Sequence, residues 1–293
     1  MAPIEPIKER GGMGLLKTTR PLRRRRRSLK DMIIDKRSLS RSFFAAALAF
    51  GLSLGVYTGA TASESSHPHW AYDGEHGPEH WGHMSGEYAA CAGGKSQSPV
   101  DIKGYEEKDL PDIAFGYKPS GINIVNNGHT IQVNYDKGSS IKVDGVEYRL
   151  AQFHFHDPSE HTVGGKSYAM ELHFVHRNDK GDLAVVGVLF ESGKENAAYG
   201  KVFANMPKKA DEKKEIKDTV DAAALLPEVK TYYRYAGSLT TPPCTEGVTW
   251  LLLKTPVQLS EAQIKSFKDI FSGNNRPVQP VNDRKITADT VSK

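Results

Sequence analysis

Two short runs of residues, 152–156 and 171–176, constrain the fold of this chain more than any other part of the sequence. The first reads Gln-Phe-His-Phe-His and the second reads Glu-Leu-His-Phe-Val-His. Side chains on a strand alternate between its two faces, so Gln152, His154 and His156 share one face, while the intervening phenylalanines point into a core. A Gly-Gly pair between the runs indicates a turn. We therefore expect the runs to form two antiparallel neighbouring strands.

This pairing predicts a metal site. The same alternation places Glu171 and His173 on one face of the second run. Pairing the strands could bring His154, His156 and His173 to one point, and three histidines with an open fourth position are the ligand set of a catalytic zinc site. Gln152 and Glu171 each precede a histidine by two residues on the same face, where they can accept the second ring N–H.

Other interpretations of these histidines stay open. A His-x-His pair on an apolar strand is by itself a weak signal, and such pairs more often pack than bind metal. His-x-His followed by Glu160 also matches the metal-binding core of the cupins, in which the glutamate is a ligand. Cupins, however, have glycine where this chain has Tyr148, and their later Pro-x-Gly-x-x-His motif is missing. His161 and His176 fit the site less well, and we expect structural roles for both.

The charge is divided unevenly along the chain. Residues 1–62 carry 13 Lys/Arg and 4 Asp/Glu, so the remaining 231 residues have a net charge of −5, although the whole chain is at +4. The sequence therefore does not predict nucleic-acid binding. An apolar segment at 43–56 follows basic residues and precedes Ala60-Thr61-Ala62, the pattern of a secretory signal. An uncleaved anchor is the alternative.

These features predict a basic leader plus signal peptide at 1–62, and a mature domain at 63–293 that is periplasmic or secreted and not stably inserted in a membrane. Cys91 and Cys244 both lie in the mature part. An even count in an oxidising compartment favours one disulfide, and two buried free thiols are the alternative.

The mature part is expected to be one mainly β (α+β) domain with short peripheral helices. Residues 63–93 are rich in His, Trp and Gly without a helical period, which indicates an irregular arm; its histidines favour packing or surface roles over a second metal site. Alternating runs separated by turn residues predict strands at 122–125, 130–135, 140–143 and, as a fully buried strand, 183–190. Composition predicts helix over 194–226, with Ile216, Val220 and Ala224 at four-residue spacing as its core contacts. A Ser260–Gln263 capping box predicts another helix, with Ile264, Phe267 and Phe271 facing inward.

The stretch Ser-Leu-Thr-Thr-Pro-Pro at 238–243 is a further motif that bears on the fold and function. Together with the two histidine runs and Ser-Glu-His-Thr-Val at 159–163, the chain closely resembles the α-class carbonic anhydrases. The resemblance spans about 67–282, with further matching motifs at 69–70, 77–81, 97–102, 126–129 and 275–277. It implies a large central, twisted, mostly antiparallel sheet. It also implies reversible hydration of carbon dioxide to bicarbonate and a proton, by attack of zinc-bound hydroxide with a histidine proton shuttle.

The resemblance implies a role for each matching position. His154, His156 and His173 match the Zn²⁺ ligands, and their partners match Gln152, Glu171 and the backbone carbonyl of Asn274. Thr240 matches the acceptor of a hydrogen bond from the hydroxide, Glu160 the acceptor of the threonine proton, and His129 the proton shuttle. The apolar substrate pocket, flanked by Thr241, matches Val175, Val185, Leu239, Val248 and Trp250, and the water path matches Tyr72, Asn127 and Gln132.

The resemblance also implies partners and limits. Cys91 and Cys244 occupy the positions where exported members have a disulfide. Sulfonamides and small anions are the expected inhibitors, and the sequence leaves monomer and homodimer open. The segment after His156 is shorter than in the animal enzymes, which indicates a more open cavity rim. A catalytically silent relative that only binds ligands is the alternative, although such relatives usually lack a metal histidine and none is missing here.

Overall fold

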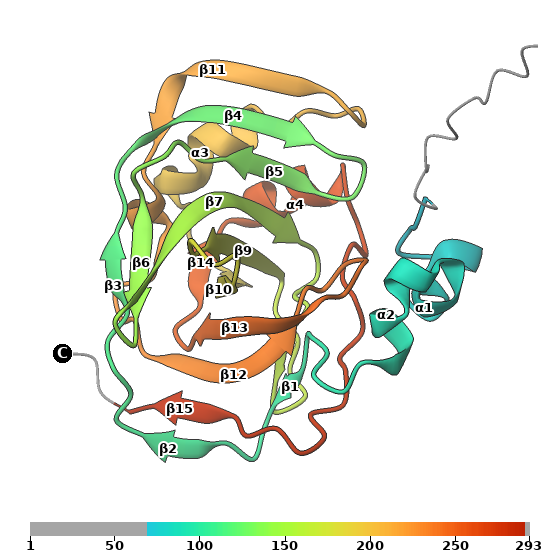
Figure 1. Ribbon diagram of the computed structural model, residues 1–293. Helices are drawn as coiled ribbons and strands as arrows, with labels where there is room; N and C mark the ends of the chain where they lie inside the picture. The colour runs from blue at the N-terminus through green and yellow to red at the C-terminus, as the bar shows by residue number, and fades with distance from the viewer. Residues whose placement is uncertain (1–68, 291–293) are drawn as a thin grey trace, which may run out of the picture. The chain divides into compact units, whose positions relative to one another are not determined.

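A computed structural model describes residues 69–290 of the chain (Figure 1). The predicted leader, signal peptide and cleavage site, and the first residues of the arm, lie outside this range. Within 69–290, no helix is both long and apolar enough to cross a membrane.

The described part is built mainly of strands, with a few short helices. The strands are β1 (Asp101–Ile102), β2 (Glu106–Lys108), β3 (Ala114–Gly116), β4 (Ser120–Asn126), β5 (Ile131–Asn134), β6 (Ser140–Val143), β7 (Val146–His156), β8 (Thr162–Val163), β9 (Met170–Arg177), β10 (Leu183–Ser192), β11 (Lys213–Val220), β12 (Tyr232–Ser238), β13 (Glu246–Leu253), β14 (Val257–Leu259) and β15 (Thr287–Asp289). The α-helices are α1 (Trp81–Met84), α2 (Ala90–Gly93), α3 (Ala197–Ala204) and α4 (Glu261–Lys268), and the 3₁₀ helices are η1 (Gly74–His76), η2 (Gly86–Tyr88) and η3 (Ala222–Leu225).

One 13-stranded sheet organises the domain, in the order β11-β4-β5-β7-β9-β10-β13-β12-β15-β2 along its main path. Most neighbours are antiparallel, and the parallel pairs of this sheet are β10–β13, β10–β14 and β15–β2. The sheet is strongly curved in Figure 1, and its middle strands β7, β9 and β10 run through the centre of the domain. This confirms the predicted fold class.

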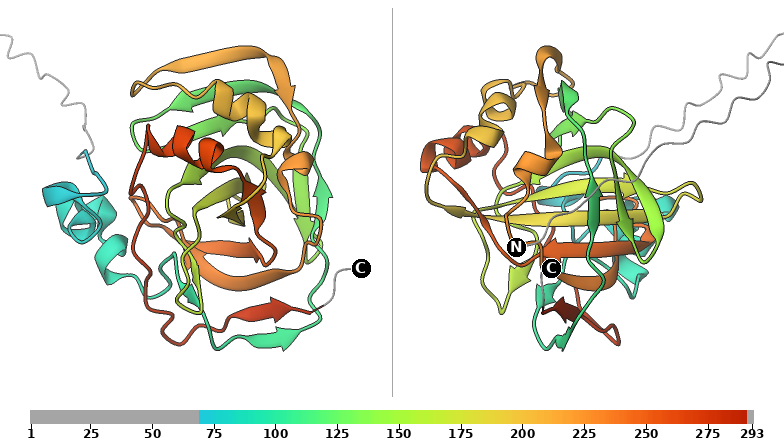
Figure 2. Two further views of the ribbon diagram at one scale, coloured as in Figure 1. Left: turned by 180° about the vertical axis from the view of Figure 1, so that it is seen from behind. Right: turned by 90° about the vertical axis from the view of Figure 1, so that its left-hand side faces the viewer.

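The larger of the core clusters lies on the face of the sheet opposite the histidines. Phe153, Phe155 and Phe174 alternate with the histidines and are fully buried. They join one large cluster that includes Tyr199 from α3 and Phe267 from α4, and Figure 2 shows both helices on the same side of the central strands. Because burying one aromatic side chain stabilises a fold by roughly 2–3 kcal/mol, this face holds the backbone of β7 and β9 firmly in place.

The helix predicted within 194–226 is wrong over most of its length. Only α3 is α-helical there, and residues 213–220 form strand β11, which pairs with β4 at the end of the sheet path. Lysine and glutamate favour a helix locally, but strand pairing and the burial of Val220 override that preference. The charged side chains suit an edge strand, since they discourage pairing with another chain.

Other local expectations are confirmed. The predicted strands correspond to β4, β5, β6 and β10, and a complete Ser260–Gln263 capping box opens α4. Phe267 is buried, whereas Phe271 lies beyond the last residue of α4 and packs against the same core.

The arm consists of short helical turns fixed to the domain at several points. Trp81 is fully buried, and the Cys91–Cys244 disulfide joins α2 to the loop after β12, which confirms the predicted pairing. Buried Arg276 donates hydrogen bonds to the carbonyls of Cys91 and Ser98 and to Gln97 Oε1.

Candidate metal centre

Strands β7 and β9 bring three histidines together. The strands are antiparallel neighbours, as predicted, and His154 lies directly opposite His173, while His156 lies opposite Glu171. The register shifts between Leu150 and Gln152. The three imidazole centroids are 4.6–5.2 Å apart, and one nitrogen of each ring lies within 4.8 Å of the others. The cluster is therefore compact enough to hold a single cation.

Hydrogen bonds orient each ring and leave one nitrogen free. His154 Nδ1 donates to Gln152 Oε1 (2.9 Å), and His156 Nδ1 donates to the carbonyl of Asn274 (2.7 Å). His173 Nε2 donates to Glu171 Oε1 (2.8 Å). The nitrogens that remain are Nε2 of His154, Nε2 of His156 and Nδ1 of His173. His156 Nε2 is buried without a hydrogen-bond partner among the described residues, which fits a metal ligand.

Burial keeps at least two of these rings neutral. It lowers the pKa of His154 well below its usual value, and the adjacent His156 and His173 lower it further. Burial also lowers the pKa of His156, although Glu160 acts in the opposite direction. Neutral imidazole is the form that binds a metal.

Glu171 connects the cluster to a second hydrogen-bond network. It accepts from His173 Nε2, from His161 Nδ1 (2.7 Å) and from the His161 backbone N–H (2.8 Å). Burial alone would raise the pKa of Glu171, but His161 and His173 outweigh it and hold that pKa well below its usual range. The His161–Glu171–His173 group is thus a set of hydrogen bonds, and the structural role expected for His161 agrees with its contacts.

The sequence did not reveal the rest of this network. Tyr235 OH lies 2.7 Å from His161 Nε2 and 2.8 Å from Ser98 Oγ. Ser98 belongs to a motif that carries the family resemblance, but nothing in the motif indicated this contact. Arg276 was missed in the same way: its backbone N–H donates to Glu160 Oε1 (2.8 Å).

Glu160 lies beside the cluster, with Oε1 3.7 Å from His156 Nδ1, and the side chains of Glu160 and Thr240 are both buried. Glu160 Oε2 is 3.9 Å from His173 Nδ1 and has no hydrogen-bond partner among the described residues, so no bond from Thr240 to it is formed in this structure. Thr240 follows β12 in a loop closed by Cys244 N–H donating to the Thr241 carbonyl (2.8 Å) and by the disulfide.

The predicted apolar pocket residues gather in one cluster. Val185, Val248 and Trp250 are buried in it, and Val175 and Leu239 pack against it. The Trp250 ring lies 4.8 Å from the His173 ring. This apolar surface therefore adjoins the metal-ligand candidates.

A cavity of about 120 Å³ opens onto the cluster. His154 and His156 line it together with six other residues that were predicted for the site, namely Tyr72, Asn127, His129, Gln132, Gln152 and Thr241. Trp70 and Thr130 also line it and were not assigned roles from the sequence. Asn127 Oδ1 accepts from the backbone N–H groups of His129 and Thr130 and so fixes the turn between β4 and β5.

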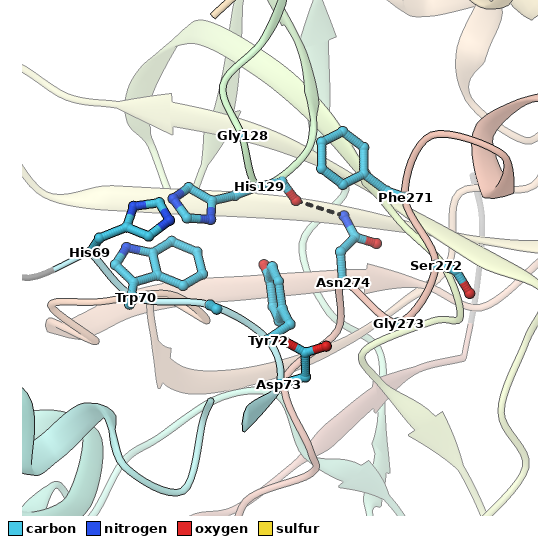
Figure 3. A pocket seen from close by; sticks show the side chains of 11 residues that line it. His69, Trp70, Tyr72, Asp73, Gly128, His129, Phe271, Ser272, Gly273 and Asn274 are labelled. Atoms are coloured by element: carbon cyan, nitrogen blue, oxygen red, sulfur yellow. Dashed lines mark hydrogen bonds between the residues drawn. The ribbon is translucent and has the colours of Figure 1, made fainter. Parts of the chain in front are cut away.

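His129 is held at the outer edge of this cavity. Its ring is half-buried and stacks on Trp70 at 3.7 Å with an interplanar angle of 9°. Its carbonyl accepts from Asn274 Nδ2 (3.1 Å), as Figure 3 shows. The same asparagine therefore positions both His156 and the turn that carries His129. The exposed arm histidines, within the described range, form no further group with metal-ligand spacing.

Known proteins are similar to this chain in sequence and in fold. The family model described as eukaryotic-type carbonic anhydrase matches residues 76–290. The carbonic anhydrase of Klebsiella pneumoniae is 48% identical over 74% of this chain and 90% of its own length, and that of Neisseria gonorrhoeae is 47% identical over 78% and 90%. A structure of the α-carbonic anhydrase of Thermovibrio ammonificans with the inhibitor sulfanilamide superposes with a TM-score of 0.73, at 48% identity over 75% of this chain and 98% of that one. The chain therefore belongs to the eukaryotic-type carbonic anhydrase family and is an enzyme of that class.

Proposed function

We propose that this chain binds one Zn²⁺ through His154, His156 and His173 and uses it for the reversible hydration of carbon dioxide to bicarbonate and a proton. The observation that carries the proposal is the convergence of three oriented imidazoles, each with one nitrogen directed to the same place. One of these nitrogens is buried without a hydrogen-bond partner among residues 69–290. Three histidines suit zinc. When bound, zinc supplies a Lewis acid that lowers the pKa of a coordinated water to about 7, the value known for carbonic anhydrases.

Thr240 and Glu160 orient the nucleophilic water in this proposal. Glu160 Oε2 is buried and has no hydrogen-bond partner in the described part of the chain, and leaving a buried carboxylate oxygen unpaired costs about 1–3 kcal/mol. We assign the buried Thr240 hydroxyl as the donor to that oxygen. When the Thr240 hydroxyl donates its hydrogen bond to Glu160, Thr240 Oγ1 can only accept a further hydrogen bond. It therefore favours a nucleophilic oxygen that still carries a hydrogen to donate.

The apolar cluster receives the substrate. Carbon dioxide has no net charge and no hydrogen-bond donor, so a surface formed by Val175, Leu239 and Trp250 binds it without a desolvation penalty. We assign Val185, Val248 and Thr241 to the same pocket.

His129 carries the product proton away from the cavity. Burial lowers its pKa, and His69 lowers it further, so protonated His129 readily releases its proton at neutral pH. Tyr72, Asn127 and Gln132 line the same cavity and would order the water that links it to the metal centre.

The test uses purified protein, zinc analysis and stopped-flow carbon dioxide hydration. We expect one zinc per chain and rapid hydration, and the His154→Ala variant should lose the zinc and nearly all activity. His83→Ala, which removes an exposed arm histidine, is the matched control. A His154→Ala variant that kept both zinc and activity would refute the ligand assignment. Zinc binding without hydration would instead favour a silent relative.

A primary sulfonamide provides a second probe of the same site. The similar Thermovibrio ammonificans enzyme has been solved with sulfanilamide, and we propose that sulfanilamide binds here at the metal centre. It should compete with small anions and should not bind the His154→Ala protein. Equal affinity for both proteins would place the sulfonamide elsewhere.

We also propose that residues 1–62 direct export and are removed, leaving 63–293 as the mature domain in the periplasm or outside the cell. The apolar segment at 43–56 supports this proposal, as does the Cys91–Cys244 disulfide, since disulfides persist in oxidising compartments. Mass analysis of the protein from the extracytoplasmic fraction tests it: a mass that includes the leader would contradict removal.

A further inference from the structure

Positive charge gathers around a cavity of about 690 Å³ that is separate from the cavity at the metal centre. Its lining includes four cationic side chains and one carboxylate, namely Lys137, Arg149, Arg177, Lys180 and Asp179. Arg177 is the last residue of β9 and follows the candidate ligand His173 by four positions, or about 13 Å along the strand. The two cavities therefore share strands β7 and β9 but no lining residue.

The strand register sets two of these cations against each other. Arg149 on β7 lies directly opposite Arg177 on β9. Directly opposite residues of an antiparallel pair have Cα atoms about 4.5–5.5 Å apart, and like charges in such a pair destabilise it. An anion bound between the two side chains would remove this repulsion. Guanidinium groups suit an oxyanion in particular, because their planar donors can bind two oxygens at once.

Only one of the four cations has an ionic partner within residues 69–290. Arg149 donates a hydrogen bond to Asp179, whose side chain is 84% exposed. Exposed ion pairs of this kind contribute little to stability, so an incoming anion can replace the Asp179 carboxylate. Arg177, Lys137 and Lys180 form no ion pair with another residue in this range. Their charges are therefore available to a ligand.

The loop after β9 is held rigidly in position. Asn178 Oδ1 accepts from the backbone N–H groups of Lys180 and Asp182 (both 2.9 Å), and Asn178 Nδ2 donates to Asp182 Oδ2 (2.8 Å). Gly181 has a φ of +94°, and a Cβ at this position would lie 3.2 Å from the guanidinium of Arg177. Glycine thus permits the turn and leaves room for the arginine. Such a preorganised wall lowers the entropy cost of binding.

The rest of the wall is less polar. Leu150 is buried, and Ala151 is the additional residue at the register shift in β7. The Tyr135 ring also lines the cavity, while its hydroxyl donates to the backbone carbonyls of Lys118 and Val220. The cavity volume lies in the range of small-molecule sites and exceeds what a bare oxyanion needs.

We propose that this cavity is a binding site for a small phosphomonoester. The phosphoryl group lies between Arg149 and Arg177, and Lys137 and Lys180 add positive charge around it. The organic part of the ligand rests on the wall formed by Tyr135, Leu150 and Ala151. The site does not use the metal centre, so the proposal is independent of the proposed carbon dioxide hydration.

Calorimetric titration with phenyl phosphate tests the proposal, because this probe joins a phosphoryl dianion to a small apolar group. We expect saturable binding at one site per chain, and benzoate should bind at least about tenfold more weakly, because it carries one charge fewer. Undetectable binding at 10-fold molar excess over about 1 mM protein, or equal binding of benzoate, would overturn the proposal.

Substitutions in the cavity provide the sharper test. Arg177→Gln should lower the affinity at least about tenfold, and Arg177→Lys, which keeps the charge but not the planar donors, should lower it less. Lys194→Gln removes an exposed cation outside the cavity and is the matched control. Equal losses in Arg177→Gln and Lys194→Gln would show non-specific attraction and overturn the site.

Asp179→Asn should have the opposite effect. Removal of the carboxylate that competes for Arg149 should raise the affinity about threefold. Glu228→Gln, which removes an exposed carboxylate outside the cavity lining, should leave the affinity unchanged. The same affinity in Asp179→Asn and the unmodified chain would contradict the displacement of Asp179 by the ligand.

A final arm separates this cavity from the metal centre, where small anions are also expected. His154→Ala should bind phenyl phosphate as the unmodified chain does, and the backbone amide signals of Lys180 and Gly181 should shift in both proteins. Loss of binding in His154→Ala, or unshifted loop signals, would place the ligand at the metal centre and refute the proposal. A protein without zinc or hydration activity that still binds the probe would refute only the proposed function.

Discussion

Removal of the Cys91–Cys244 disulfide should destabilise the domain strongly while leaving its site intact. The bridge joins residues separated by 153 positions. In the chain-entropy model, closing a loop of this length removes about 17 cal/mol/K from the unfolded state, or about 5 kcal/mol at 25 °C. Measured losses for native disulfides are about 2–5 kcal/mol. We therefore expect a loss of about 3–5 kcal/mol, equivalent to a fall in Tm of about 10 °C for a domain of this size.

The folded geometry should survive because other contacts cross the same junction. Arg276 donates to the Cys91 carbonyl, and Gln97 donates to the Cys244 carbonyl (3.0 Å). Removal of the bridge therefore acts mainly by raising the entropy of the unfolded chain and not by changing the folded one. Zinc content and kcat/KM at 25 °C should change little. The unfolded chain also expands when the cross-link is removed, so the denaturant m-value should increase.

Urea unfolding of zinc-free protein is the assay, because a bound metal would obscure the two-state analysis. It compares the oxidised chain, the reduced chain and a Cys91→Ser/Cys244→Ser double variant. The reduced chain and the double variant should coincide, and reductant should have no effect on the double variant. A stability change below about 1 kcal/mol, or an unchanged m-value, would refute the reasoning about the unfolded state.

Three further predictions concern single side chains. Gln152→Ala should weaken zinc binding by about 10–100-fold in a chelator competition, because His154 loses the acceptor of its second N–H, whereas Gln132→Ala should have little effect; equal losses would contradict the orientation role. Burial lowers the pKa of His176 to about 3 from an ordinary 6.5, so the unfolded chain binds a proton that the folded chain refuses. The contribution of neutral His176 to the free energy of unfolding is therefore present above pH 6.5, and it is lost by up to about 1.4 kcal/mol per pH unit as the pH falls toward 3. In His176→Asn the free energy of unfolding should depend less on pH over this range, and parallel pH curves for the two proteins would contradict this. Ser260→Ala removes the N-cap of α4 and should cost about 1 kcal/mol in urea unfolding, with no change in zinc content.

Local sequence patterns correctly predicted those features that depend only on neighbouring residues in the chain. The two-residue period of a strand places Gln152, His154 and His156 on one face whatever the rest of the chain does. The turn residues between alternating runs likewise located β4, β5 and β6, and the capping box located the start of α4. The same local reasoning wrongly predicted a helix at β11. A segment rich in lysine and glutamate gives no local sign that it will pair with β4, a strand far away in the sequence.

The family resemblance supplied roles that no local pattern could. The position of Asn274 as the partner of His156 came from matching motifs and not from spacing. The proposed pairing of Thr240 with Glu160 has the same origin. Arg276 and Ser98 lay within matching motifs, yet their contacts with Glu160 and Tyr235 appeared only in the structure.

By itself, the sequence determined which faces of its strands carry histidine and which carry phenylalanine, since side-chain direction depends only on position along a strand. The tertiary structure decided which of those faces meet. The register that sets His154 opposite His173, the Asn274 carbonyl that reaches His156 across 118 positions, and the arm that brings His69 to His129 all depend on the packing of distant segments. Packing of that kind is a property of the whole folded chain, because each long-range contact exists only when many others hold its two segments together.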